Sequence, residues 1–441
     1  MSLPRYPEYK DSGVEWFGEV PVHWDVLRFQ RLVQVAEGQV DPEDARFSSM
    51  PLIAPNHVES GTGRLLALES ASKQGAESGK YLCHKGDVVY SKIRPALRKV
   101  CIAPEPCLCS ADMYPLRARS GLSNTFLLWL MLSEQFSSLA VLESQRVAMP
   151  KINRESLKDL ELLVPPLPEQ TVIAAFLDRE TAKIDALVAE QERLIELLKE
   201  KREAVISHAV TKGLNPDVPM KESGVEWLGE IPKHWEVGPL KRYWTVTDCK
   251  HVTAEFVDDG IPVASIREVQ GKWVALEDAK RTTETFYEAL IEGERRPQPG
   301  DLIFSRNATV GEVAQVGVNH PRFAMGQDVV LLRKMAADVS SDYLQHLIRS
   351  PVVMEQLALW MIGSTFKRIN VDEIRCIIVP SPPPDEQRLI ADRLEAAVTR
   401  FDPLTAEAQR AIDLLRERRT ALISAAVTGQ IDVREAGGRA A

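Results

Sequence analysis

The chain has 441 residues, a net charge of −9, and hydrophobic and charged shares of 44% and 27%, which are ordinary for a globular protein. Its length exceeds the about 250–300 residues at which single cores stop growing, and no run approaches the about 20 apolar residues of a membrane span, so a multidomain cytoplasmic protein is expected. The acidic balance disfavours a protein that coats DNA indiscriminately, but it permits one that meets DNA on a single face.

A tryptophan-rich segment opens the chain and returns in its second half. Residues 10–26 read KDSGVEWFGEVPVHWDV and residues 221–237 read KESGVEWLGEIPKHWEV, with twelve identities in seventeen positions. Other matching segments follow in the same order, at offsets that grow only from 211 to 217. The chain is therefore a tandem of two similar halves.

The repeated segment is best interpreted as framework, because it is common to both halves and cannot read two different targets. Its His-Trp pairs, at 23–24 and 234–235, could instead dock a partner protein. For Trp16 and Trp227 we expect packing on the root of their own unit.

Each opening segment precedes a region of about 130 residues with mixed signals. Short β-like runs at 87–90, 301–304 and 329–332 are bounded by Gly, Pro and Asn, and helical patches lie at 124–142 and 341–361. This mixture predicts an α+β fold in each half.

Basic side chains gather where the two halves differ within a shared pattern. Between Lys80 and Lys99 there are six basic residues and one acidic residue, and the Gly-Asp pair at 86–87 returns at 300–301. Arg and Asn can make paired hydrogen bonds to base edges, and Lys and Ser suit phosphates. Solvated loop charge is the alternative for any single residue. The predicted DNA-contacting set is Ser91, Lys92, Arg94, Arg98, Lys99, Arg146, Lys151, Ser305, Arg306, Asn307, Thr309, Lys367 and Arg368.

Each half closes on a long helix. A proline-rich break, VPPLPEQ at 164–170 or VPSPPPDEQ at 379–387, ends the preceding strand. Apolar residues then recur at three- and four-residue spacing to about residue 212 and again to about residue 427, while Pro403 should kink or break the second helix. A helix that is polar except for one stripe needs a partner, so the two are expected to pair antiparallel as a spacer. Packing of each helix on its own half is the alternative.

The sequence contains no catalytic constellation. Residues 75–81, GAESGKY, resemble a phosphate-binding loop but are one residue short and lack its Ser or Thr. There is no G-x-S-x-G elbow and no H-E-x-x-H helix, and NPDV at 215–218 lacks the second proline and the aromatic residue of a base-clamping methyltransferase loop. We therefore predict no catalytic residue in this chain.

The six cysteines form no C-x-x-C pair and are expected to stay reduced. Cys107 and Cys109, with Cys101 and His84 nearby, do not have the spacing of known zinc motifs, and the second half has no counterpart. We therefore expect neither a metal nor a cofactor on this chain.

Over residues 10–431 the chain resembles the specificity subunit of type I restriction–modification enzymes. The resemblance rests on S-G-V-E-W-x-G-E-x-P-x-H-W before each variable region, G-D-[VL]-[VI]-[YF]-S within it, and K/R-I-N and P-P-x-x-E-Q before each long helix. It implies two α+β target-recognition domains separated by two long antiparallel coiled-coil helices. The implied domains are 1–164 and 215–381, the helices 165–214 and 382–431, and the tail 432–441.

The resemblance implies a DNA-binding subunit that reads a bipartite target, one domain per half-site. Its partners would be two methyltransferase subunits that bind S-adenosylmethionine and two restriction subunits that use ATP and Mg²⁺, with none of these cofactors on this chain. A coiled-coil scaffold that does not bind DNA is the alternative, and an unrecognised nuclease is a third.

Overall fold

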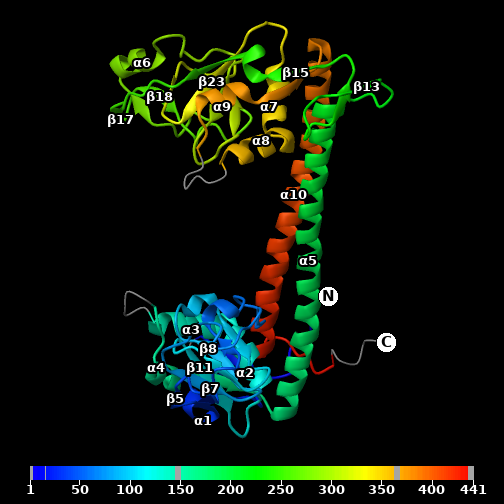
Figure 1. Ribbon diagram of the computed structural model, residues 1–441. Helices are drawn as coiled ribbons and strands as arrows, with labels where there is room; N and C mark the ends of the chain where they lie inside the picture. Colours follow the sequence, from blue (N-terminus) through cyan, green and yellow to red (C-terminus); the bar gives the residue numbers. More distant parts are fainter. Residues whose placement is uncertain (1–2, 15, 145–149, 362–367, 436–441) are drawn as a thin grey trace. The chain divides into compact units, whose positions relative to one another are not determined.

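The computed structural model describes residues 3–14, 16–144, 150–361 and 368–435 (Figure 1). The chain divides into two compact units. Unit 1 combines Met1–Glu192 with Gln409–Ala441, and unit 2 is Arg193–Ala408. Each unit therefore holds the globular region of one repeat together with a part of each long helix. The predicted α+β fold, with a tandem of two similar units and two long antiparallel helices, is confirmed.

Each unit is built on a four-stranded inner sheet of the same topology. The strand order is β4-β11-β8-β9 in unit 1 and β16-β23-β20-β21 in unit 2, and all neighbours are antiparallel. All four side chains of β8 and of β20 are buried, which explains their continuous apolar runs VVY and LIF. The strands are β4 (Val33–Val35), β8 (Val88–Ser91), β9 (Val100–Ile102), β11 (Met113–Ala118), β16 (Trp244–Asp248), β20 (Leu302–Ser305), β21 (Val313–Gln315) and β23 (Val329–Lys334).

The outer sheet of each unit has a different strand order. In unit 1 the order is β5-β7-β10-β6, and in unit 2 it is β17-β19-β18-β22. Thus the third strand in chain order pairs with the fourth in unit 1 but with the second in unit 2. The two repeats diverge in this sheet while they share the inner one. Its strands are β5 (Gln39–Val40), β6 (Leu52–Ile53), β7 (Lys80–Cys83), β10 (Cys107–Cys109), β17 (Phe256–Val257), β18 (Ile261–Ala264), β19 (Arg281–Thr282) and β22 (Ala324–Met325).

The repeated opening segments form hairpins and lead into a strand that meets the end of the globular region. The hairpins are β1 (Tyr9–Asp11) with β2 (Glu19–Pro21), and β13 (Met220–Glu222) with β14 (Glu230–Pro232). The strand pairs that follow are β3 (Asp25–Arg28) with β12 (Glu161–Val164), and β15 (Glu236–Pro239) with β24 (Ile378–Ser381). In each repeat, the last strand before the long helix therefore pairs with the strand that follows the opening hairpin.

Each predicted helical patch is divided in two by a buried serine. Ser133 and Ser350 each donate a hydroxyl hydrogen bond of 2.6 Å to the carbonyl three residues earlier, where the first helix ends. The described helices of the globular regions are α1 (Phe29–Leu32), α2 (Asn124–Leu132), α3 (Glu134–Ser144), α4 (Arg154–Asp159), α6 (Glu284–Ile291), α7 (Ser341–Ile348), α8 (Pro351–Met361) and α9 (Val371–Cys376), with 3₁₀ turns η1 (Pro55–His57), η2 (Pro95–Leu97) and η3 (Leu240–Arg242).

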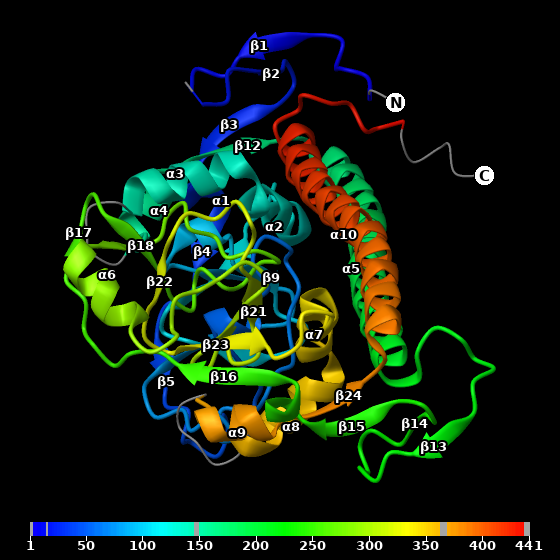
Figure 2. The same cartoon turned by 90° about the horizontal axis from the view of Figure 1, so that it is seen from above.

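The long helices are α5 (Leu167–Lys212) and α10 (Pro384–Val427), and they lie side by side (Figures 1 and 2). In unit 1, Asp185 and Glu192 of α5 pair with Arg419 and Arg416 of α10, at 2.9 and 3.0 Å. Because the residue number falls on α10 as it rises on α5, the helices are antiparallel. In unit 2, Arg202 pairs with Asp402 at 2.8 Å.

Two features of these helices bear on the predictions. Helix α10 continues through Pro403, so the proline does not break it; the proline is exposed, and water can satisfy the carbonyl that loses its partner. The predicted apolar stripe is not buried throughout: Leu187, Leu194 and Leu404 are 51%, 41% and 49% exposed. Part of each helix therefore presents leucine to its surroundings.

No single helix in the described part of the chain is long and apolar enough to cross a membrane. The bent pair α2–α3 passes the test of length and composition only when its two helices are joined, and most large apolar side chains of α2 are buried in the core of unit 1.

Candidate nucleic-acid interface

The first long helix begins with a carboxylate that holds the opening segment of unit 1. Glu169 accepts hydrogen bonds from the Tyr6 hydroxyl (2.6 Å) and from Trp24 Nε1 (3.0 Å), and it contacts His23 Nε2 at 2.8 Å. Trp24 is fully buried. Burial, followed by the hydrogen bond to Glu169, raises the pKa of Tyr6, so this tyrosine stays a donor. The His-Trp pair is thus tied to the start of α5.

Unit 2 repeats this arrangement at the start of α10. Glu386 accepts from Trp235 Nε1 at 3.0 Å and contacts His234 Nε2 at 2.8 Å. The interpretation of the His-Trp pairs as framework is supported by these contacts. Trp227 packs partly buried against the core of unit 2, and Trp16, which is 50% exposed, lines a cavity with Leu139 and Leu142 of its own unit.

The same tryptophans also contact the end of the other long helix. Gly429 ends α10 with a φ of 71°, and a Cβ there would lie 2.5 Å from Pro21 and 3.2 Å from Trp24. Gly213, with a φ of 75°, has Trp235 at the corresponding 3.2 Å. Only glycine suits both the left-handed conformation and the close approach. Within each unit, the His-Trp segment therefore fixes one helix start and one helix end.

The Gly-Asp motif forms a second framework element. The glycines that precede the two aspartates have φ of 88° and 89°, which favours glycine at both turns. Arg117 donates two hydrogen bonds of 2.8 Å to Asp87, and Arg333 donates bonds of 3.0 and 2.8 Å to Asp301. These hydrogen bonds are the main reason that the pKa of each arginine is raised. The motif anchors the inner sheet at the strand that leads to the basic residues.

The two basic segments predicted in each half meet in space, and we call the place where they meet the loop junction. In unit 1 it consists of residues 91–99 and 151–154; Ile93 and Lys151 form a β-bridge, and the Ile152 N–H donates to the Lys92 carbonyl at 2.9 Å. In unit 2 it consists of residues 305–309 and Arg368, and Asn307 and Arg368 form the matching bridge. The structure therefore brings together side chains that are about 60 residues apart in the chain.

The serines of the loop junctions shape the loop. Ser91 and Ser305 are both buried, and their hydroxyls donate to the carbonyls of Ile93 and Asn307 at 3.1 and 3.2 Å. Ser305 also shares a 3.0 Å hydrogen bond with the Thr309 hydroxyl. The geometry gives these serines a turn-forming role.

The cations of the unit 1 junction differ in how far they reach solvent. Arg94 and Lys151 are exposed, and Arg94 has a left-handed φ of 49°. Lys92 is half-buried with its Nζ 5.3 Å from the Tyr114 ring centroid, and burial, then the charge of Lys151, lowers its pKa. Arg98 and Lys99 are half-buried at the far end of the loop. The exposed charge is thus concentrated at Arg94 and Lys151.

Sequence reasoning missed Arg154, which joins this group. Its guanidinium lies 5.1 Å from the Tyr114 ring centroid, donates to the Ala36 carbonyl at 2.8 Å and pairs with Glu37 at 3.6 Å. The second half has Val371 at the matching position, so a comparison of the halves could not have singled out this arginine.

In unit 2 the central cation of the loop junction, Arg306, is buried. The Arg306 side chain is 5% exposed, and its Nε and one terminal nitrogen have no hydrogen-bond partner among the described residues. Its ion pair with Asp248, which sequence reasoning also missed, is long at 3.6 Å. Asn307 and Thr309 are half-buried, and Arg368 is exposed and 3.7 Å from Asp328. Arg306 is therefore buried beside Asp248 and does not reach solvent in this structure.

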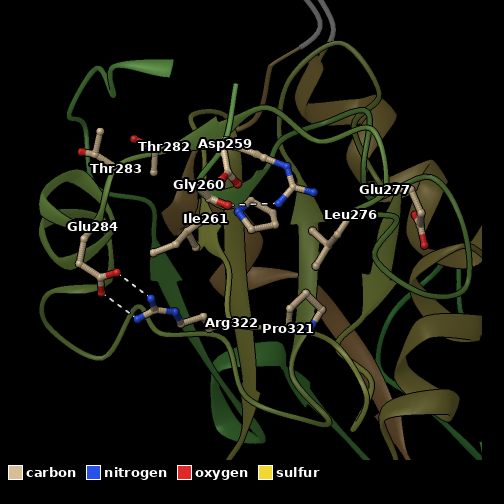
Figure 3. A pocket seen from close by; sticks show the side chains of 12 residues that line it. Asp259, Gly260, Ile261, Leu276, Glu277, Thr282, Thr283, Glu284, Pro321 and Arg322 are labelled. Atoms are coloured by element: carbon tan, nitrogen blue, oxygen red, sulfur yellow. Dashed lines mark hydrogen bonds and ion pairs between the residues drawn. The ribbon is translucent and has the colours of Figure 1, made fainter. Parts of the chain in front are cut away.

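Two predicted residues, Arg146 and Lys367, lie outside the described residues. A separate cavity of about 750 Å³ opens elsewhere in unit 2 (Figure 3). Three carboxylates line it, Asp259, Glu277 and Glu284, together with Arg281 and with Arg322, which donates two hydrogen bonds of 2.7 and 2.6 Å to Glu284. This mixed lining has no excess of positive charge for a polyanion.

Family models and similar proteins agree on one family for this chain. The model described as "Type I restriction modification DNA specificity domain" matches residues 21–197 and 253–412. The EcoDI type I restriction enzyme specificity subunit of Escherichia coli is 34% identical over 168 residues, which are 38% of this chain and 37% of that protein. The chain thus matches little more than a third of that relative's length. The putative MjaX specificity subunit of Methanocaldococcus jannaschii is 23% identical over 451 residues, which are 98% of this chain and 99% of that protein.

Two solved structures share the fold. A chain from a structure that describes complex assembly and conformational transition of the type I R-M system has a TM-score of 0.70 at 16% identity, covering 92% of this chain and 98% of that one. The HsdS subunit from Thermoanaerobacter tengcongensis has a TM-score of 0.51 at 16% identity, covering 93% and 98%.

Proposed function

The chain belongs to the type I restriction modification DNA specificity domain family, and from this premise we propose that it is the sequence-reading subunit of a restriction–modification complex. Each unit would read one half of a bipartite DNA target. The observation that carries this proposal is the loop junction, which both units build on the same backbone contacts with different side chains.

The two loop junctions carry different side chains at equivalent backbone positions, and recognition of two different half-sites requires such differences. Equivalent backbone positions hold Lys92 in unit 1 and Arg306 in unit 2, since their N–H groups donate to the Asp112 and Asp328 carbonyls, at 3.0 Å in each case. The next position holds Ile93 in one unit and Asn307 in the other. An apolar side chain can contact a thymine methyl, and an asparagine can pair with adenine. A common backbone with different side chains therefore supports two different half-sites.

The exposed cations are proposed as phosphate contacts. Arg94 and Lys151 would serve the first half-site and Arg368 the second, and phosphate contacts of this kind position a protein without reading sequence. The buried Ser91, Ser305 and Arg306 would act by holding the loops in shape. Secondary contacts are proposed for Lys92, Arg98, Lys99, Arg146, Asn307, Thr309 and Lys367.

The long helices are proposed as the docking surface for partner subunits. Leu187 on α5 and Leu404 on α10 are exposed and lie 217 positions apart, and Leu197 and Leu414 repeat the same relation. An apolar surface that recurs in both repeats fits two copies of one partner. We propose two methyltransferase subunits there, joined by two restriction subunits.

Catalysis would belong to those partners. S-adenosylmethionine would be bound by the methyltransferase subunits, and ATP and Mg²⁺ by the restriction subunits. The purified chain alone should then neither methylate nor cleave DNA. Metal-dependent cleavage by the chain alone would contradict this assignment.

The test is salt-dependent binding of the purified chain to duplex DNA, with and without the proposed phosphate contacts. Each phosphate contact that is lost should reduce the slope of log K against log salt by about 0.9. We expect Lys151→Ala and Arg368→Ala to reduce the slope, while Lys158→Ala, on the surface of α4 and paired with Glu155, leaves it unchanged. Absence of salt-dependent binding by the unaltered chain would favour a scaffold.

A further inference from the structure

A cavity of about 530 Å³ opens in unit 2 between the segment that follows β16 and the outer sheet. Its floor is apolar: Val263 and Leu290 are 5% and 2% exposed and belong to one small core cluster beneath it. The volume lies within the range of pockets that hold small organic ligands. The floor can therefore seal a flat apolar face from water.

One wall of this cavity is an aromatic ring. Phe256 is 49% exposed, and the amino group of Lys280 lies 4.8 Å from its ring centroid. Its backbone is held by pairing of β17 with β19 and by a 2.7 Å hydrogen bond from the Thr282 hydroxyl to the Glu255 carbonyl. The ring is fixed and half-exposed with the Lys280 amino group over one face, and nucleobases stack on exposed aromatic rings near cations of this kind.

The lining of the cavity is cationic. Arg267 and Lys280 contribute two positive charges, and none of the described residues that line the cavity is a carboxylate; Arg267 pairs with Glu268, outside the lining, at 3.6 Å. The neighbouring cavity of Figure 3 is lined by three carboxylates and two arginines, so the excess of positive charge belongs to the smaller cavity. A positive rim over an apolar floor suits a base that carries a phosphate.

Two of the segments that line the cavity are close in sequence to residues that contact the loop junction of unit 2. Gln327 on its rim precedes Asp328, whose carbonyl accepts from the Arg306 N–H at 3.0 Å. Val252, which also lines the cavity, follows the segment that begins at Asp248, the ion-pair partner of Arg306. DNA held at the loop junction would therefore pass close to the mouth of the cavity.

We propose that this cavity receives one unpaired nucleobase, together with its phosphate, from the DNA bound by unit 2. The base stacks on Phe256, and Lys280 and Arg267 hold the phosphate. A base inside a duplex cannot reach such a cavity, so the nucleotide must leave the stack. The inference rests on the proposed function. A free nucleotide in solution is the other source of the same chemistry.

The experiment measures affinity of the full chain for duplexes that carry one bulged nucleotide at successive positions of the second half-site. A bulge at the right position removes the cost of unpairing, so the unaltered chain should bind it about tenfold more tightly than the fully paired target. Phe256→Ala should abolish this preference and Phe256→Trp should keep it. The matched control is Trp273→Ala, because Trp273 is 47% exposed with Lys272 5.7 Å from its ring centroid but does not line this cavity.

The outcomes separate the inference from the proposed function. If the unaltered chain does not discriminate its target from scrambled duplex, the proposed function fails. If it discriminates but shows no bulge preference, or if Phe256→Ala keeps the preference, the cavity is not a base site. Competition by free nucleoside monophosphate that Phe256→Ala removes, without a bulge preference, would assign the cavity to a free nucleotide and overturn the DNA proposal.

Discussion

Glu169 and Glu386 occupy matching positions but differ in their burial and in the number of side chains that they hold. Glu169 is 7% exposed and receives the Trp24, Tyr6 and His23 side chains, whereas the Glu386 side chain is 24% exposed and receives two partners. Buried donors without an acceptor are costly, so the two carboxylates should differ in their contribution to stability.

Glu169→Ala is therefore expected to lower the free energy of unfolding by about 3 kcal/mol, because it strands two buried donors. Glu386→Ala should cost about 1–2 kcal/mol, and Glu200→Ala, on the exposed surface of α5, should be nearly neutral. Chemical denaturation monitored by tryptophan fluorescence measures all three. Equal losses for Glu169→Ala and Glu200→Ala would refute the anchoring role.

Arg306 was predicted from the sequence as a DNA-contacting residue, and the structure buries its side chain. Its backbone joins Asp328 and Ile369 by hydrogen bonds, and its guanidinium lies 3.6 Å from Asp248. Arg306→Ala should therefore impair reading of the second half-site and leave the first intact. Sequencing of the methylated motif tests this, and an unchanged target preference would remove Arg306 from the set.

At the scale of elements, an Asp–Arg ion pair joins the long helices once in each unit, and the two pairs differ in their exposure to solvent. Asp185–Arg419 in unit 1 and Asp402–Arg202 in unit 2 are related by the same offset of 217. The Arg419 side chain is 9% exposed and also donates to the carbonyls of residues 61 and 62, while that of Arg202 is 40% exposed. The two equivalent ion pairs are therefore expected to contribute differently to the free energy of unfolding.

Arg419→Ala should cost about 3 kcal/mol, because it leaves a partly buried carboxylate and two carbonyls without their donor. Arg202→Ala should cost less than about 1 kcal/mol, since an exposed pair is screened by water. Denaturant titration of both variants provides the comparison. A cost for Arg202→Ala that equals or exceeds that for Arg419→Ala would contradict the role given to burial.

At the scale of the whole molecule, the repeat made most of the architecture predictable. Twelve identities between 10–26 and 221–237 established the tandem, and the apolar residues at three- and four-residue spacing after the proline-rich break predicted α5, because these signals are local. The long-range contacts were not predictable in this way. The burial of Arg306, the participation of Arg154 and the exposure of Leu187 all depend on residues far away in the chain.

The basic residues of the candidate site were visible in the sequence, but their spatial arrangement was not. The bridges Ile93–Lys151 and Asn307–Arg368 join two segments of each half, and the order of these segments in the sequence did not indicate this contact. Which of their side chains face solvent depends on the turn: the left-handed φ of Arg94 accompanies an exposed side chain, while the hydroxyls of Ser91 and Ser305 turn inward. Sequence spacing carries no information on these directions.

The central claim is that this chain determines which DNA sequence is methylated. The most direct measurement maps methylated bases across the genome in cells that express the chain with the methyltransferase subunit proposed as its partner, and in cells that lack only this chain. We predict a split motif that is present in the first cells and absent from the second. The same methylated motif in both would contradict the account.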